Sequence, residues 1–283
     1  MRKFRAPACV LWLILGGLSA CNRSVAIDDA RLKDADRDSA NWLQYGRTYD
    51  DHRYSPLTQI NEQTVGKLGL AWSRELNTTR GLEATPLVEN GVIYTTGSWS
   101  VVYAIDALTG DIRWSYDPKV PRERAYFICC DVVNRGVALY HGKVYLGTLD
   151  GRLIALDERT GVPVWSVMTA DSAKPLSITG YPRIAKGLVV IGNAGAEYGI
   201  RGYVSAYDAE TGKMAWRTYT VPGDPSRGFE SRAMESGCQN LERPVVDRRR
   251  RRQRMGGNRL RSGSRFAVFR NGECHRLVPR PAR

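Results

Sequence analysis

An eleven-position motif, Ala-x-Asp-x-x-Thr-Gly-x-x-x-Trp, occurs three times and constrains the fold of this chain more than any other feature. The copies cover residues 104–114, 155–165 and 206–216, so successive copies begin 51 residues apart. Two short apolar runs separated by turn residues precede each copy, in 86–96, 137–147 and 183–192. Three or four short strands per unit, with no helix-period stretch, predict an all-β chain and exclude a helical solenoid. We therefore expect a β-propeller with about 50 residues per blade.

The chemistry of the motif is that of a turn followed by a docking side chain. Its aspartate ends a strand and can accept backbone N–H groups of the turn, and its glycine permits the positive φ that reverses the chain. Its tryptophan lies on the outer strand, where the next unit can bury it. We predict structural roles for the three aspartates and do not nominate them as catalytic bases: Asp106, Asp157 and Asp208.

The third repeat is longer than the others just before its motif. From the glycine that ends the second strand to the alanine of the motif, the chain advances 7, 8 and 14 residues in the three repeats. The extra residues, Asn193–Gly199, are glycine-rich and carry one acid. Such an insertion in a repeating scaffold is a candidate functional loop, although a tolerated surface loop would have the same appearance.

Residues 1–21 have the pattern of an export signal. Three basic residues precede an apolar stretch of 10 residues, Cys9–Leu18, which is too short to span a bilayer as a mature helix. Leu18-Ser19-Ala20-Cys21 matches a bacterial lipobox, so we expect a lipid anchor at Cys21, with ordinary signal cleavage as the alternative. Either route predicts a periplasmic protein, in which disulfides are permitted. Residues 22–40 are acidic, and we expect them to form a solvated tether.

The net charge of +13 is concentrated at the end of the sequence. Residues 1–231 hold 27 basic and 25 acidic side chains, whereas residues 232–283 hold 15 arginines, no lysine and 4 acids. A nucleic-acid-binding tail is one interpretation, but an exported protein would seldom meet nucleic acid, so we expect no such partner. We favour a shifted reading frame after about Ser231, which would make 232–283 an aberrant, disordered tail.

Residues 41–231 resemble the pyrroloquinoline quinone (PQQ)-dependent alcohol dehydrogenases of the methanol and ethanol type, which are eight-bladed propellers. The resemblance rests on the repeats, on the entry segment 42–57 and on an expected strand at Leu70-Ala71-Trp72. It implies that the chain holds about three to four blades from the N-terminal part of such a propeller.

The resemblance also implies a set of site residues. Adjacent Cys129 and Cys130 match a strained disulfide ring that stacks on the quinone, with two buried thiols as the alternative. Arg135 matches an arginine that pairs with quinone oxygens and carboxylate, Glu83 an acid near a cofactor carboxylate, and Thr179 a hydroxyl donor to the cofactor.

The insertion falls where the family has its metal site. By this resemblance Ala194, Gly195 and Ala196 line the cofactor and Glu197 is a ligand of Ca²⁺, with a lanthanide not excluded. The catalytic base of the family, an aspartate, matches no residue of this chain.

Two classes of function follow from these features. The first is oxidation of a small alcohol to the aldehyde by hydride transfer to PQQ, with Ca²⁺ as Lewis acid and a periplasmic cytochrome or membrane quinone as electron acceptor. We expect the 283-residue chain itself to be inactive, because the matched parts of the site are incomplete. The alternative is a non-enzymatic propeller lipoprotein that acts as a scaffold in outer-membrane assembly. The cysteine pair and the metal-ligand insertion favour the enzyme.

Overall fold

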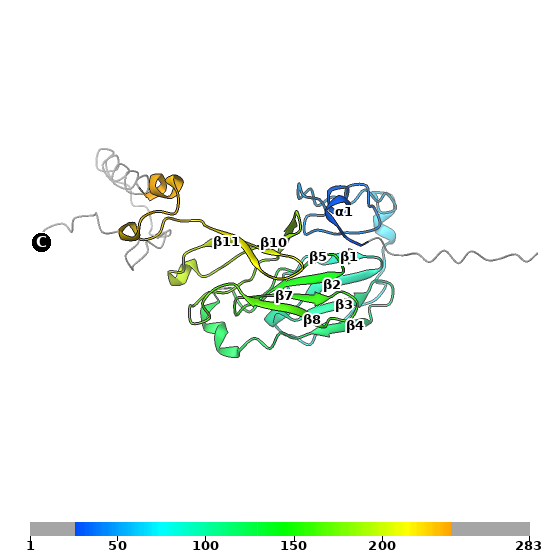
Figure 1. The fold of residues 1–283 in the computed structure, drawn as a ribbon. Coiled ribbons are helices and arrows are strands. Elements are labelled where there is room, and N and C mark those ends of the chain that lie inside the picture. Colours follow the sequence, from blue (N-terminus) through cyan, green and yellow to red (C-terminus); the bar gives the residue numbers. More distant parts are fainter. Residues whose placement is uncertain (1–25, 129, 239–283) are drawn as a thin grey trace, which may run out of the picture.

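The computed structural model describes residues 26–128 and 130–238 and arranges their strands in three antiparallel four-stranded sheets (Figure 1). In each sheet the strands are hydrogen-bonded in sequence order. Blade one comprises β1 (Leu87–Glu89), β2 (Val92–Thr96), β3 (Val102–Asp106) and β4 (Ile112–Tyr116). Blade two comprises β5 (Ala138–Tyr140), β6 (Lys143–Gly147), β7 (Arg152–Asp157) and β8 (Pro163–Met168). Blade three comprises β9 (Arg183–Ala185), β10 (Leu188–Gly192), β11 (Tyr203–Asp208) and β12 (Met214–Tyr219). These sheets confirm the prediction of a partial β-propeller.

The helices of the described residues are short and lie outside the sheets, before the first strand, between strands or after the last strand. The labelled ones are α1 (Asp29–Lys33) and five 3₁₀ turns, η1 (Val65–Lys67), η2 (Ser98–Ser100), η3 (Arg122–Phe127), η4 (Ala196–Tyr198) and η5 (Pro225–Arg227). Residues 232–238 form a further helical stretch at the end of the described residues. Within the described part of the chain, none of the helices is long and apolar enough to cross a membrane.

The first two strands of each blade are joined by the same two-residue turn. Both central residues have positive φ, which is the type I′ geometry that matches the twist of a hairpin. The φ angles are 49° and 74° at Asn90-Gly91, 47° and 69° at His141-Gly142, and 51° and 72° at Lys186-Gly187. The sequence pattern therefore corresponds to one hairpin built three times.

The repeated motif joins each unit to the next. Asp106, Asp157 and Asp208 end the third strands of their blades and accept backbone N–H groups of the following turns, as predicted. The glycine of each turn lies under the tryptophan of the preceding unit, so closely that an added Cβ would be 2.5–2.8 Å from the indole. The indole N–H donates to a carbonyl of the same turn: Trp72 to Ala107 at 3.1 Å, Trp114 to Glu158 at 2.9 Å and Trp165 to Ala209 at 3.1 Å.

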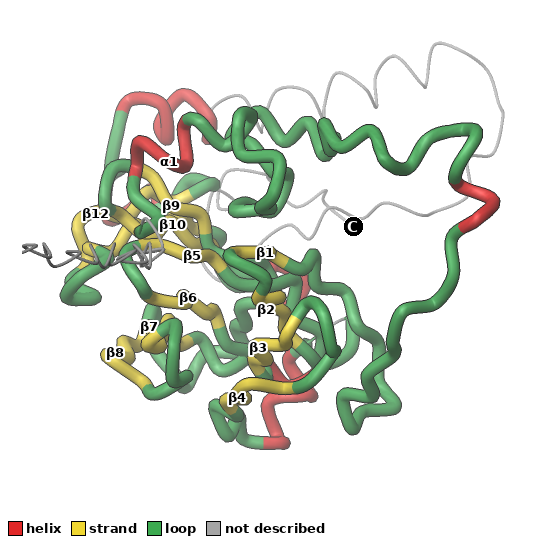
Figure 2. Tube along the Cα trace, turned by 90° about the vertical axis from the view of Figure 1, so that its right-hand side faces the viewer, coloured by secondary structure: helices red, strands yellow, loops and turns green. Residues whose placement is uncertain are grey.

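Residues 26–40 are part of the folded body, so the prediction of a solvated tether is wrong for them. Ile27, Leu32 and Ala35 are each no more than 2 % exposed, and Ile27 and Leu32 belong to the core cluster of the blades. The Asp28 side chain caps α1 by accepting from the backbone N–H of Arg31, whose guanidinium pairs with Glu89 of β1 at 2.8 Å. The prediction rested on the acidic composition of the segment and overlooked these few apolar positions, whose burial attaches residues 26–40 to the blades. Figure 2 shows α1 lying over the side of the molecule where β5 and β9 are found.

Two further expectations differ from the structure. Residues 70–72 form no strand, and Leu70 is 85 % exposed, because no described strand lies beside it to accept its ladder hydrogen bonds. At the other end, residues 232–238 are helical and Cys238 is buried, so the expected disordered tail does not begin at residue 232. The export signal, Cys21 and the arginine-rich residues 239–283 lie outside the described residues.

Candidate functional site

Three of the predicted site residues meet just before the innermost strands of the three blades. Glu83 precedes β1, Arg135 precedes β5 and Thr179 precedes β9. The Arg135 guanidinium pairs with the Glu83 carboxylate at 2.8 Å and donates to the Thr179 hydroxyl at 2.9 Å. The repeat therefore brings together residues that are about 50 positions apart in sequence, one from each blade.

The backbone around Arg135 is held by neighbouring segments. The Arg135 N–H donates to the Thr179 carbonyl at 3.0 Å, and the Thr85 N–H donates to the Arg135 carbonyl at 3.4 Å. Next to it, the buried Asn134 side chain donates to the Gly147 carbonyl at 2.7 Å. The arginine is thus fixed at its base while about a third of its side chain stays exposed, so an anion can reach the guanidinium.

A stacked pair of tyrosines lies beside this cluster. The rings of Tyr45 and Tyr181 are 3.7 Å apart and nearly parallel. A hydrogen bond with Thr85, followed by one from Arg53, lowers the pKa of Tyr45 below its ordinary value, and Arg135 adds to this effect. Sequence reasoning included Tyr45 in the entry segment but did not nominate it for the site.

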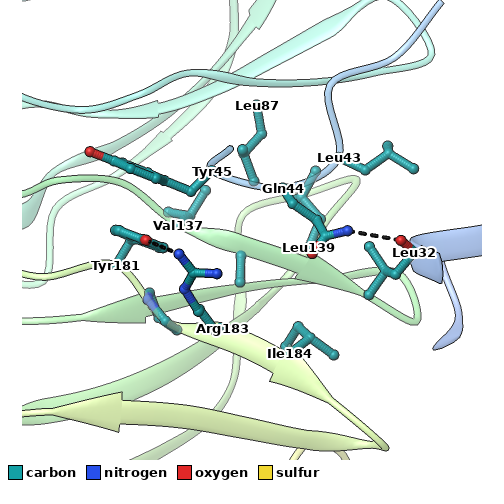
Figure 3. A pocket seen from close by; sticks show the side chains of 12 residues that line it. Leu32, Leu43, Gln44, Tyr45, Leu87, Val137, Leu139, Tyr181, Arg183 and Ile184 are labelled. Atoms are coloured by element: carbon teal, nitrogen blue, oxygen red, sulfur yellow. Dashed lines mark hydrogen bonds between the residues drawn. The ribbon is translucent and has the colours of Figure 1, made fainter. Parts of the chain in front are cut away.

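The tyrosine pair borders a pocket at the centre of the three blades. Figure 3 shows Tyr45 and Tyr181 at one side and Leu32 of α1 at the other, where the Gln44 amide donates to the Leu32 carbonyl at 2.8 Å. The remaining wall comes from the innermost strands and their flanks, including Leu87, Val137, Leu139 and Ile184. The N-terminal segment therefore forms one wall of this pocket.

The predicted disulfide ring is not formed in the structure. Cys130 is a free, exposed thiol, and Cys129 lies outside the described residues. The following residue, Asp131, adopts a positive φ of 68° and pairs with Arg80 at 2.6 Å. Cys130 is therefore exposed beside this turn and free, where the resemblance implied a closed ring.

The insertion of the third repeat forms one tight turn. Ala194 pairs with Ser177 in an isolated bridge, and Gly195 adopts a φ of 119° at a place where a Cβ would lie 2.9 Å from the Pro175 carbonyl. Ala196 and Glu197 belong to η4, and Glu197 is exposed. Among the described residues, no group of three His, Cys, Asp or Glu side chains gathers to hold a metal ion. Glu197 therefore contributes a single carboxylate.

Sequence reasoning missed the element that connects the cysteine segment to the insertion. In η3, Arg124 is 9 % exposed and donates to the carbonyls of Ser172, Lys174 and Leu176. The Phe127 ring meets Tyr198, the neighbour of Glu197, edge to face at 6.2 Å. No motif marked Arg124, because its acceptors are backbone carbonyls, which leave no trace in the sequence.

Comparison with known proteins agrees with this arrangement. The family model described as PQQ, glucose/ethanol/alcohol dehydrogenase, beta-propeller domain, matches residues 42–241, beyond the change of composition near Ser231. The quinohemoprotein alcohol dehydrogenase ADH IIB of Pseudomonas putida is 58 % identical over 207 residues, which are 73 % of this chain and 30 % of that protein.

Two solved structures are similar as well. The quinohemoprotein alcohol dehydrogenase ADHIIG from Pseudomonas putida HK5 superimposes with a TM-score of 0.73 at 59 % identity, covering 75 % of this chain and 31 % of that one. A europium-containing methanol dehydrogenase gives a TM-score of 0.66 at 39 % identity, covering 69 % and 34 %. The chain thus spans about a third of the length of the relatives it matches. Because the family model covers well over half of its residues, the chain belongs to the PQQ-dependent glucose, ethanol and alcohol dehydrogenases, within their β-propeller domain.

Proposed function

We propose that this chain is part of a PQQ-dependent alcohol dehydrogenase and that its share of the cofactor site is the cluster of Glu83, Arg135 and Thr179. One observation supports the proposal above the others. The guanidinium of Arg135 is oriented by Glu83 on one side and Thr179 on the other, at the point where three innermost strands begin.

The donor set of this cluster suits a small, flat, anionic quinone. A guanidinium offers a planar fork of N–H donors that fits carboxylate and paired oxygens, and Thr179 adds a hydroxyl donor. Glu83 keeps the fork in place through an exposed ion pair, which by itself stabilises the fold by at most about 1 kcal/mol. When bound, PQQ would supply a two-electron acceptor for the hydride of an alcohol. The residues of this chain would bind and orient it.

The described residues do not complete a metal site. Calcium takes about six to eight oxygen ligands, and Glu197 is one exposed carboxylate that belongs to no group of three possible ligand side chains in the described part of the chain. We keep Glu197 as one proposed ligand of Ca²⁺ or a lanthanide and derive no step of the reaction through it. The cysteine pair stays a proposed wall of the quinone site.

The remaining parts of the proposal concern the whole enzyme. We infer a small alcohol as substrate, a cytochrome or a membrane quinone as electron acceptor, and a periplasmic location, with a lipid on Cys21 if the lipobox is used. The scaffold alternative is not favoured, since relatives that are 58 % and 56 % identical to this chain over the aligned residues are named quinohemoprotein alcohol dehydrogenases.

The test is titration of the 283-residue chain with PQQ, followed by quenching of tryptophan fluorescence. We expect weak, saturable binding that Arg135→Lys reduces on the order of tenfold, because lysine loses the fork that serves two acceptors at once. Thr179→Val should weaken binding less. The control is Arg74→Lys, which alters an exposed ion pair with Asp111 on the outer side of blade one. Equal affinity of all four proteins would reject the assignment of the cluster.

A further inference from the structure

The junction of α1, blade one and blade two contains two glutamates that the repeat does not predict. The residue after the motif aspartate is alanine in the first and third repeats, Ala107 and Ala209, but Glu158 in the second. At the last position of the innermost strand, β1 ends in Glu89, whereas β5 and β9 end in Tyr140 and Ala185. Both departures from the repeat therefore occur at the same interface.

The two side chains meet in a confined place. Glu89 is 7 % exposed and Glu158 is half-buried, and both side chains line one pocket, where their carboxyl groups interact. Two neighbouring carboxyl groups can share a hydrogen bond only if one of them carries a proton, since an ionised carboxylate only accepts. Burial, and next the nearby charge of Glu89, raise the pKa of Glu158 to about 7.

The charged groups around the pair come from every element packed on it. Arg31 of α1 pairs with Glu89 at 2.8 Å and reaches Asp38 at 3.4 Å. The hydroxyl of Tyr94 of β2 interacts with Glu158, and Asn90 donates a hydrogen bond to Glu89. Arg113 of β4 and Arg159 line the pocket that borders the pair. Arg31 balances the charge of Glu89, so ionisation of Glu158 adds a second negative charge beside it.

We propose that Glu89 and Glu158 are a proton-sharing pair that makes the attachment of α1 and blade two to blade one sensitive to pH. When the proton is present, the Glu158 carboxyl donates to the Glu89 carboxylate and Arg31 neutralises the remaining charge. When the proton is released to solvent through the bordering pocket, two like charges face each other across the interface. The second interface, with Ala209 in place of Glu158, has no such pair.

The sign of the effect follows from the direction of the shift. An acid whose pKa is raised by folding stabilises the folded state below the pKa of the unfolded chain, and this contribution is lost as pH rises through the folded value. Between pH 5.5 and pH 8 the pair should raise the unfolding equilibrium constant of the chain by on the order of tenfold.

The experiment compares urea unfolding of the full 283-residue chain at pH 5.5 and pH 8 with that of Glu158→Gln and Glu158→Ala. Glutamine keeps a donor to Glu89, and alanine restores the residue of the other repeats, so both variants should fold. We expect both to lose the tenfold pH dependence relative to wild type and to be at least as stable as wild type at pH 8. The control, Glu62→Gln at an exposed loop position, should keep it.

A second measurement does not depend on any variant. In the protein with ¹³C-labelled glutamate carboxyl groups, one carboxyl resonance should titrate near neutral pH and should disappear in Glu158→Gln. The proposal is overturned if every glutamate resonance titrates below pH 5.5, or if the Glu158 variants keep the pH dependence of the wild-type chain within twofold.

Discussion

The interface between blades one and two and the interface between blades two and three use one docking geometry with different side chains. In both, a tryptophan covers the glycine of the next turn and donates to the carbonyl of the residue after the motif aspartate. That residue is Glu158 in the first interface and Ala209 in the second, where the acid comes one position later, at Glu210.

Because Glu210 lies one position later in its repeat than Glu158, the two acids have different environments. Glu158 is half-buried and its pKa is raised to about 7, whereas Glu210 is exposed and pairs with Lys143 at 2.7 Å, which lowers its pKa. Because the docking bond uses a backbone carbonyl, the side chain at that position is free to differ. A repeat can therefore acquire a new polar site without losing the contact that holds its blades together.

The strongest test of the shared geometry is removal of its tryptophan. We expect Trp165→Ala to destabilise the chain by about 3 kcal/mol, the lower end for truncation of a large aromatic side chain, because Trp165 is partly buried. Trp216 has the same place in the motif but is 43 % exposed, so Trp216→Ala should cost less than about 1 kcal/mol. Urea unfolding measures both. Equal losses would mean that docking on the next blade contributes nothing.

A smaller loss should follow from filling the space under the indole. An added Cβ at Gly161 would lie 2.5 Å from the Trp114 ring, and the residue has a φ of 71°. We expect Gly161→Ala to destabilise by about 2 kcal/mol from crowding and backbone strain together. Gly142 has nearly the same φ, 69°, with open space at its Cβ, so Gly142→Ala should cost about 1 kcal/mol from strain alone. The difference between the two variants isolates the contact with tryptophan.

The elements that the sequence predicted are those fixed by local geometry. The hairpin turns, the aspartate caps and the positive φ of the motif glycine depend on residues close together in the chain, so a pattern of 51 residues contains them. The resemblance added Glu83, Arg135 and Thr179, which the structure brings together.

The missed features depend on contacts between distant segments. Arg124 binds three backbone carbonyls, and Ile27 and Leu32 fill a gap beside the blades despite their acidic surroundings. Glu89 and Glu158 are 69 positions apart, and each by itself is an ordinary surface-type residue. Their meeting follows from the way two blades stack, which composition and spacing do not show.

Transplanting the acid tests whether burial at this position is enough to raise a pKa. Ala209→Glu places a carboxyl in the second interface, where Tyr145 is fully buried. Burial should raise its pKa, so stability should fall as pH rises through the folded value, by about 1.4 kcal/mol for every tenfold difference in proton affinity between the folded and unfolded chains. Ala209→Gln has nearly the same volume without the charge and should show no such dependence. Parallel pH curves for the two variants would show that the second interface tolerates a charge and that the first is not special.

The smallest expected effect is that of removing one tyrosine hydroxyl, either from Tyr94 of β2 or from Tyr145 of β6, which occupy equivalent positions in blades one and two. The Tyr145 hydroxyl donates to the Ala209 carbonyl at 3.1 Å, a carbonyl that Trp165 also serves, so Tyr145→Phe leaves no acceptor unpaired. Its cost should be about 0.5–1 kcal/mol and independent of pH between 5.5 and 8.

The equivalent hydroxyl in blade one, that of Tyr94, interacts with the Glu158 carboxyl instead and lowers its pKa. Tyr94→Phe removes a donor that favours the ionised form, so it should raise the pKa of Glu158 further and cost more at pH 8 than at pH 5.5. Urea unfolding of both variants at the two pH values measures the contrast. The destabilisation by Tyr94→Phe could instead be as independent of pH as that by Tyr145→Phe. That result would mean that water already solvates the Glu158 carboxyl on the side of Tyr94, and that Tyr94 does not stabilise its charge.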